Sequence, residues 1–248
     1  MTRFKFKPSF DDALFIAGYY SGIGENIKAV EYYRKSLELG KGNGFDYSYK
    51  IFENIANAVW KDELSFNEVI PAADAVLGMA KKNNKNIVDV ARLMTRLADK
   101  TGSFDRLEKY LRAGIEASSG TNNKQLKNAN VDLLADYALY IRKDISKAIE
   151  IKKAGMPAGW QDSRDLYYMF AKWCLIRKIN LGEAEMFARK TLPQVQPGRF
   201  RARAYSTLAE ILEANNKIDQ AIEAIKNAAS HDPDNEYYQE ELERLESE

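Results

Sequence analysis

Apolar residues recur along this chain at helical spacing, in runs that are separated by turn-forming residues. Between 86 and 98, Ile87, Val90, Ala91, Met94 and Leu97 repeat every three or four positions, a pattern that predicts a helix with one buried face. Further runs of this kind extend to the C-terminus. The sequence therefore predicts an all-α fold.

The helices are expected to form pairs that repeat along the chain. A small or medium apolar residue follows a turn and opens a helix at about every 38 residues, which predicts about six helix pairs. These opening residues are Ala29, Ala72 or Ala73, Leu107, Ala148, Ala184 and Ala221.

Helix N-caps support this division. Ser103, Asp144 and Asn180 each lie four residues before an opening residue, where a side-chain oxygen can accept from a free amide of the first turn. Ser9 with Asp12 and Ser65 with Glu68 have the spacing of capping boxes. The turn-rich stretch 118–130, SSGTNNKQLKNAN, is predicted to be an exposed insertion.

The most regular unit is the stretch 202–235. Large and small residues alternate there on two helices before a closing proline, at Tyr205, Leu208, Ala209, Leu212, Ala221, Ile225, Ala228 and Pro233. This stretch resembles a tetratricopeptide (TPR) repeat. The resemblance implies that the chain is a single domain over 1–248, a right-handed α-α superhelix (TPR-like solenoid) of about six helix pairs.

The expected repeats cover 10–40, 46–83, 86–118, 129–155, 165–192 and 202–235. The segment 236–248 keeps apolar residues only at Tyr238, Leu242 and Leu245. It is predicted to be a capping helix, with one face on the last repeat and the other in water.

Charge and composition narrow the range of partners. The 37 Lys and Arg nearly balance the 36 Asp and Glu, so the chain has no basic surplus for nucleic acid. No stretch is long and apolar enough for a membrane span, and the protein is expected to be soluble. We expect a cytoplasmic location, or an extracytoplasmic one if a leader precedes this sequence. The lone Cys174 is expected to be a small buried hydrophobe.

The sequence offers little catalytic chemistry. The single histidine, His231, falls in the loop expected to close the last repeat. One histidine and one cysteine cannot form a histidine-rich zinc site, so no metal, cofactor or catalytic residue is expected. The many carboxylate pairs leave acid–base chemistry open.

In proteins that this chain resembles, the first helix of each pair lines a concave groove. Transferring the groove positions of the motif gives an aromatic and apolar surface flanked by arginines, formed by Tyr137, Tyr140, Met169, Trp173, Arg177, Arg92 and Arg96. This assignment requires Trp173 to be accessible. Where the chaperone-binding members of the family carry Lys and Asn, this chain has mostly Leu, Phe, Gly, Tyr and Trp, so a chaperone clamp is not expected.

The resemblance favours a non-catalytic scaffold that binds a protein or peptide in this groove. Two alternatives remain open. In the first, the chain is a structural or regulatory repeat region of a larger polypeptide or assembly. In the second, it is an extracytoplasmic repeat protein that binds a small molecule or glycan.

Overall fold

The computed structural model describes residues 8–41, 44, 46–79 and 83–247 of the chain. Within these residues the protein consists of helices and short connections, with no strand. The all-α prediction is therefore confirmed. The helices fall into two compact units, Met1–Lys152 (unit 1) and Lys153–Glu248 (unit 2).

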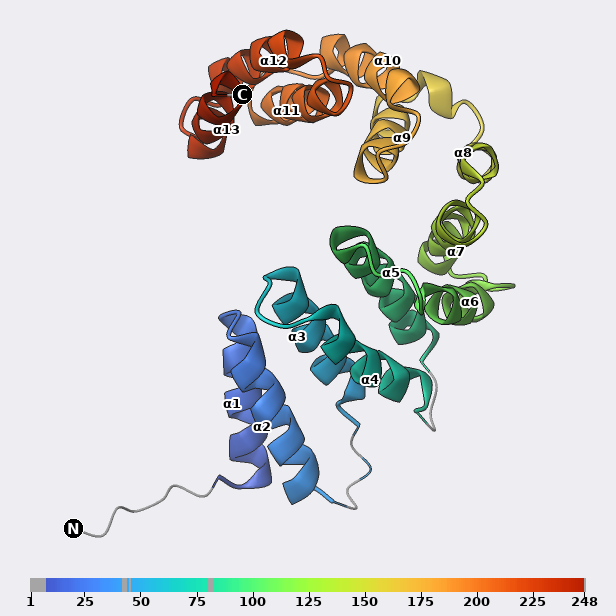
Figure 1. Cartoon of the computed structure of the whole chain (residues 1–248), viewed down its shortest axis with the longest axis vertical. Coiled ribbons are helices and arrows are strands. Elements are labelled where there is room, and N and C mark those ends of the chain that lie inside the picture. The colour runs from blue at the N-terminus through green and yellow to red at the C-terminus, as the bar shows by residue number, and fades with distance from the viewer. Residues whose placement is uncertain (1–7, 42–43, 45, 80–82, 248) are drawn as a thin grey trace, which may run out of the picture. The chain divides into compact units, whose positions relative to one another are not determined.

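Unit 1 is a stack of helix pairs. Its helices are α1 (Phe10–Gly22), α2 (Asn26–Leu39), α3 (Ser48–Trp60), α4 (Phe66–Leu77), α5 (Asn84–Thr101), α6 (Leu107–Ser118), α7 (Lys124–Asp136) and α8 (Ile145–Ala154). A π-helical turn, Tyr137–Ile141, extends α7. Each odd-numbered helix from α1 to α5 packs against its successor, and each successive pair packs on the one before it (Figure 1).

Unit 2 continues the same plan. It contains α9 (Arg164–Ile176), α10 (Leu181–Thr191), α11 (Arg199–Ala214), α12 (Ile218–His231) and α13 (Glu236–Glu246). Short 3-10 turns at Trp160–Asp162 and Leu192–Gln194 connect them. α9 pairs with α10, α11 pairs with α12, and α13 packs on α12 as the predicted capping helix.

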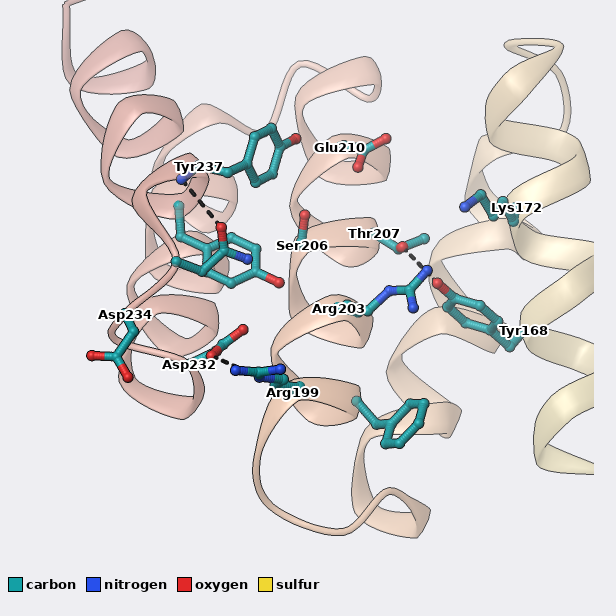
Figure 2. Close-up of a pocket in the computed structure, with 13 residues that line it drawn as sticks. Tyr168, Lys172, Arg199, Arg203, Ser206, Thr207, Glu210, Asp232, Asp234 and Tyr237 are labelled. Carbon is teal, nitrogen blue, oxygen red and sulfur yellow. Dashed lines mark hydrogen bonds and ion pairs between the residues drawn. The ribbon is translucent and has the colours of Figure 1, made fainter. Parts of the chain in front are cut away.

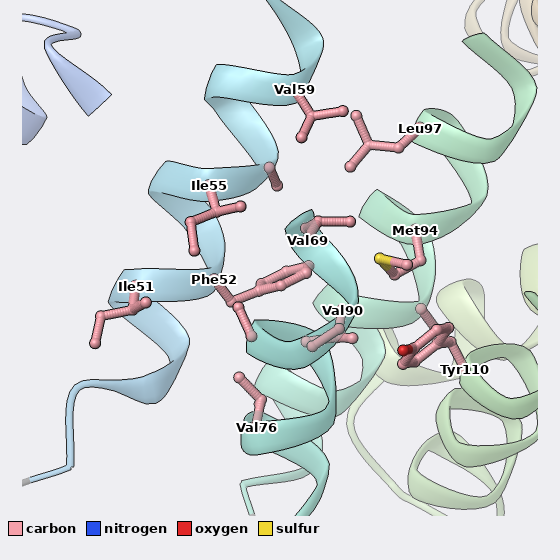
Figure 3. Close-up of a cluster of buried hydrophobic side chains, with 14 of the residues drawn as sticks. Ile51, Phe52, Ile55, Val59, Val69, Val76, Val90, Met94, Leu97 and Tyr110 are labelled. Carbon is pink, nitrogen blue, oxygen red and sulfur yellow. The ribbon is translucent and has the colours of Figure 1, made fainter. Parts of the chain in front are cut away.

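The core of unit 1 lies where successive pairs meet. Phe52 of α3, Val69 of α4 and Met94 of α5 are fully buried and point into one cluster (Figure 3). Tyr110 of α6 closes this cluster, and its hydroxyl donates to Asp74 Oδ1 at 2.7 Å, so its polar atom is satisfied. Each such side chain stabilises the stack by about 1.5–3 kcal/mol relative to exposure.

The core of unit 2 is more aromatic. The rings of Trp160, Tyr167, Phe170 and Phe187 pack together, with centroids 5.1–5.9 Å apart. Cys174 is buried among the helices, as predicted.

Several predicted caps are present. Both capping boxes form: Ser9 Oγ accepts from the Asp12 amide, and Ser65 and Glu68 cap each other reciprocally. Asp144 Oδ1 accepts from the Lys147 amide at 2.8 Å at the start of α8. Asn180 precedes α10 as predicted, but its side chain donates to Glu183 instead of accepting from the helix.

The prediction for Ser103 is wrong. Residues 104–106 form a turn, and α6 begins only at Leu107, after Arg106. His231 also differs from its predicted place, because α12 continues through it and its ring stacks on Tyr205 with centroids 5.7 Å apart.

The predicted insertion 118–130 is likewise wrong over much of its length. α7 begins at Lys124, five residues before the expected start of the fourth repeat. Asn123 caps it, since its Oδ1 accepts from the amides of Gln125 and Leu126. The first turn of α7 faces water, which is why its polar residues resemble a loop in the sequence.

Candidate functional site

The predicted site residues of unit 1 lie on α5 and on the π-helical turn. Arg92 and Arg96 are exposed, and the Arg96 guanidinium lies 4.9 Å from the ring centre of Trp60. Tyr137 and Tyr140 are half-buried. The Tyr137 hydroxyl donates to Glu108 at 2.8 Å, and the Tyr140 ring stacks on Phe104 while its hydroxyl donates to Asp99 at 3.0 Å. Both tyrosines therefore already have partners within unit 1.

The predicted residues of unit 2 differ sharply in their exposure. Met169 is 57% exposed on α9, whereas Trp173 is only 5% exposed. The Trp173 ring packs on Phe170, with centroids 6.0 Å apart, and the Arg177 guanidinium lies 4.9 Å from it. Trp173 thus lacks the accessibility that its predicted role requires, because the aromatic core of unit 2 takes up its ring.

Unit 2 contains a cavity of about 750 Å³ that α9, α11 and α13 surround (Figure 2). Its lining residues are Tyr168, Lys172, Arg199, Phe200, Arg203, Ser206, Thr207, Glu210, Asp232, Asp234, Asn235, Tyr237 and Tyr238. We call this the unit-2 cavity.

One face of α11 forms its floor. Arg199, Arg203, Ser206, Thr207 and Glu210 lie within an arc of about 100° on a helix with 3.6 residues per turn. The small Ser206 and Thr207 stand in the middle of this face, where larger side chains would fill the space. The floor is therefore hollow at its centre and charged at both ends.

The walls come from α9, from α13 and from the loop 232–235. Tyr168 and Lys172 project from α9, and the Tyr168 hydroxyl forms a 2.9 Å hydrogen bond with Thr207 Oγ1. On the other side, Asn235 caps α13 by accepting from the Tyr237 amide. This cap directs Tyr237 toward the cavity (Figure 2).

Three cations, Lys172, Arg199 and Arg203, and three carboxyl groups, Glu210, Asp232 and Asp234, line the cavity, and a single ion pair forms among these described residues. Arg199 pairs with Asp232 at 3.6 Å. Neither Lys172 nor Arg203 forms an ion pair with any described residue, although both lie at the cavity. Lys172 and Arg203 therefore have no direct ion-pair partner in the described structure, although Lys172 lies close enough to Glu210 to lower the pKa of its carboxyl group.

A carboxyl group occupies the far end of the α11 face. Loss of surrounding water raises the pKa of Glu210, and the nearby carboxylates of Glu241 and Glu213 add to this effect, while Lys172 opposes it. Burial likewise raises the pKa of the Tyr237 hydroxyl. Both groups favour their neutral forms more than they would in water.

The cavity also offers apolar contact area. Phe200 stands 76% exposed at its edge, and Tyr237 is exposed as well. Aromatic side chains with this degree of exposure beside unpaired cations are typical of surfaces that bind other molecules.

None of the seven predicted site residues lines the unit-2 cavity. The sequence does contain information about part of this cavity. When the same groove positions of the motif are transferred to the sixth repeat, they identify Arg203, Ser206 and Glu210. The contributions of the loop 232–235 and of α13 could not be found in this way, since they lie outside the groove helix of the repeat.

Two further observations concern the described part of the chain. No group of three or more His, Cys, Asp or Glu side chains there is arranged to hold a metal ion. No helix there has the length and apolar character needed to cross a membrane.

Comparison with known families identifies one repeat. A tetratricopeptide repeat model matches residues 202–235, which comprise most of α11, all of α12 and the loop that borders the unit-2 cavity. A comparison with curated proteins finds no match.

Several solved structures have a similar succession of helices. A tetratricopeptide repeat protein from Parabacteroides merdae is 14% identical, with a TM-score of 0.36, over 95% of this chain and 98% of that one. BtubC from P. vanneervenii is 11% identical, with a TM-score of 0.44, over 90% and 91%. The TPR2AB domain of yeast Sti1, solved as a pHSP90 complex, is 17% identical, with a TM-score of 0.35, over 95% and 96%.

Proposed function

Since the chain is a TPR-like helical repeat protein, we propose that it is a non-catalytic scaffold and that its unit-2 cavity binds a short segment of a partner protein. The observation that carries the proposal is the pair of unpaired cations, Lys172 and Arg203, beside the exposed ring of Phe200.

The size and composition of the cavity support a segment of a few residues. About 750 Å³ lies within the range of pockets that hold compact ligands. Lys172 and Arg203 would bind an anionic group, because a charge-assisted hydrogen bond contributes about 1.5–3 kcal/mol. Phe200 and Tyr237 would contact an apolar side chain, since aromatic rings give large contact area with few rotatable bonds.

The residues of unit 1 are a second predicted contact surface. Arg92 and Arg96 are exposed on α5, and the partly exposed ring of Trp60 lies beneath Arg96. We propose that this surface of unit 1 is a separate contact surface for a partner protein. Tyr137 and Tyr140 would take part through their exposed edges.

A charge-reversal experiment tests the proposal. The wild-type chain and the double variant Lys172→Glu/Arg203→Glu are used to capture partners from a lysate of the source organism, and captured proteins are identified by mass spectrometry. We expect a partner that the wild type retains and the variant releases. For a purified partner, the loss of affinity should be at least about thirtyfold, as for other central interface residues.

A matched control distinguishes the loss of the two cavity cations from a general effect of the changed net charge. Lys124→Glu/Lys127→Glu makes the same change in net charge on exposed residues of α7, in unit 1. This control should retain the partner. Equal retention by both variants, with helical spectra intact, would contradict binding in the unit-2 cavity.

A further inference from the structure

The carboxyl groups of the unit-2 cavity restrict the kind of segment that it can bind. Asp232 pairs with Arg199, whereas Glu210 and Asp234 form no ion pair with a described residue. An anionic group that approaches Lys172 therefore also meets unpaired negative charge. A strongly acidic segment would lose affinity through this repulsion, so net charge alone does not define a suitable ligand.

Glu210 is the carboxyl group that the fold itself uses least. It is exposed at the cavity and forms no hydrogen bond with a described residue. Packing around it removes water and raises the pKa of its carboxyl group, and Lys172 offsets only part of this rise. The neighbouring Glu213 and Glu241 already bind Arg244, at 2.8 and 2.9 Å. A positive group of a ligand beside Glu210 would stabilise its charged form.

The order of charges along α11 is the reverse of the order that stabilises a helix. Arg199 and Arg203 lie in its first two turns, and Glu210 lies near its end. Its first turn contains no acidic residue and its last turn no basic residue. A helix dipole favours carboxylates at the start and cations at the end. Features that oppose local stability in this way are typical of functional sites.

We propose that the unit-2 cavity selects segments that carry both an acidic and a basic residue. This inference rests on the proposed function of the same cavity. The acidic residue binds Lys172 and Arg203, and the basic residue binds Glu210. The cavity thus recognises a pair of opposite charges in its ligand.

The geometry of α11 sets the spacing of this pair. In Figure 2, Arg203 and Glu210 project from one side of α11, and Lys172 faces them from α9. Arg203 and Glu210 are seven residues apart in the sequence, which is about 10.5 Å along the helix axis. An extended segment rises about 3.3 Å per residue, so its two charged residues should lie about three positions apart. Long side chains widen this to roughly two to four positions.

Selection from a peptide library tests this specificity. Short random peptides displayed on phage are selected on the immobilised full chain and, in parallel, on the Lys172→Glu/Arg203→Glu variant. Peptides that bind the wild type but not this variant depend on the cavity. We expect these peptides to carry Asp or Glu and, at the spacing given above, Lys or Arg.

A double-mutant cycle with a synthetic copy of the most enriched peptide then assigns the basic residue. Replacing that residue by norleucine should weaken binding to the wild type at least about tenfold, as expected for a charge-assisted contact. The same replacement should change binding to Glu210→Gln by less than about twofold, because the opposing charge is already absent. Isothermal titration calorimetry measures these affinities.

Glu223→Gln is the matched control. It neutralises an exposed carboxylate of α12 that does not line the cavity, so the loss of at least about tenfold should persist in this variant. Glu210→Gln should keep the melting temperature of the wild type, since Glu210 has no partner in the fold to lose. A changed affinity of this variant therefore reports on binding.

The outcomes distinguish this inference from the proposed function. Cavity-dependent peptides that lack a basic residue would overturn the inference and leave the cavity a binding site. A basic residue whose loss has the same effect in Glu210→Gln as in the wild type would do the same. If no selected peptide depends on Lys172 and Arg203, both the inference and the proposed function are wrong.

Discussion

At the residue scale, the stack depends on how closely its helices approach at small residues. Gly114 of α6 shows this most clearly: a Cβ there would lie 2.5 Å from Ala91 Cβ and 2.9 Å from Leu133 Cδ1. The three residues come from α6, α5 and α7, so this one glycine sets the spacing of three helices.

Gly114→Ala should therefore destabilise the protein. Overpacking at such a contact costs about 1–3 kcal/mol, and the better helix propensity of alanine offsets up to about 1 kcal/mol of this. Gly18→Ala on α1 is the control, and it should stabilise by about 0.5–1 kcal/mol, because nothing lies near its Cβ. Urea denaturation followed by circular dichroism measures both, and equal midpoints for the two variants would refute the close contact at Gly114.

Individual site residues were harder to predict than core residues. The family pattern places Trp173 on the groove helix, but it does not show whether the neighbouring Phe170 and Arg177 cover the ring. Burial of the Trp173 ring depends on aromatic residues from several helices of unit 2, and the pattern within a single repeat does not reveal them. Core positions such as Met94 were predicted because helical spacing alone identifies them.

At the scale of the element, caps decide where helices begin, and they can be tested in pairs. Ser65 forms the predicted capping box with Glu68, whereas Ser103 lies outside the helix it was expected to cap. The sequence suggests the same capping role for both serines, whereas in the structure only Ser65 caps a helix.

Ser65→Ala should destabilise the protein by about 0.5–2 kcal/mol, since it removes the acceptor for an orphan amide of α4. Ser103→Ala should change stability by less than about 0.5 kcal/mol. Thermal unfolding of both variants provides the comparison. A larger loss at Ser103 than at Ser65 would reverse the assignment of the caps.

The fourth helix pair shows why some elements escape sequence analysis. Lys124, Gln125, Lys127 and Asn128 are polar and exposed, and Leu126 is the one apolar residue among them, so the start of α7 has too little apolar pattern to reveal it. At its other end, the π-helical turn Tyr137–Ile141 interrupts the 3.6-residue period. Counting residues from the start of the repeat therefore no longer identifies the groove-facing positions reliably at Tyr140. Tyr137 and Tyr140 do lie within the expected fourth repeat, 129–155.

At the scale of the whole molecule, helix pairing was predictable because it repeats. Small residues such as Ala29, Ala184 and Ala221 open helices or lie in their first turns, and all three are fully buried. The division into two compact units was not predicted, since no change in composition marks Lys152 and Lys153. The unit-2 cavity also needed the structure, because three helices and a loop contribute to it.

The central claim is that the unit-2 cavity holds a segment of a partner protein, and site-specific photo-crosslinking tests it most directly. A photoreactive phenylalanine analogue is incorporated at Phe200 and, as a control, at the exposed Ile145 of unit 1. The captured partner should crosslink through position 200 and much less through 145, and Lys172→Glu/Arg203→Glu should abolish the product. A partner that crosslinks equally at both positions, or only at 145, would contradict the account.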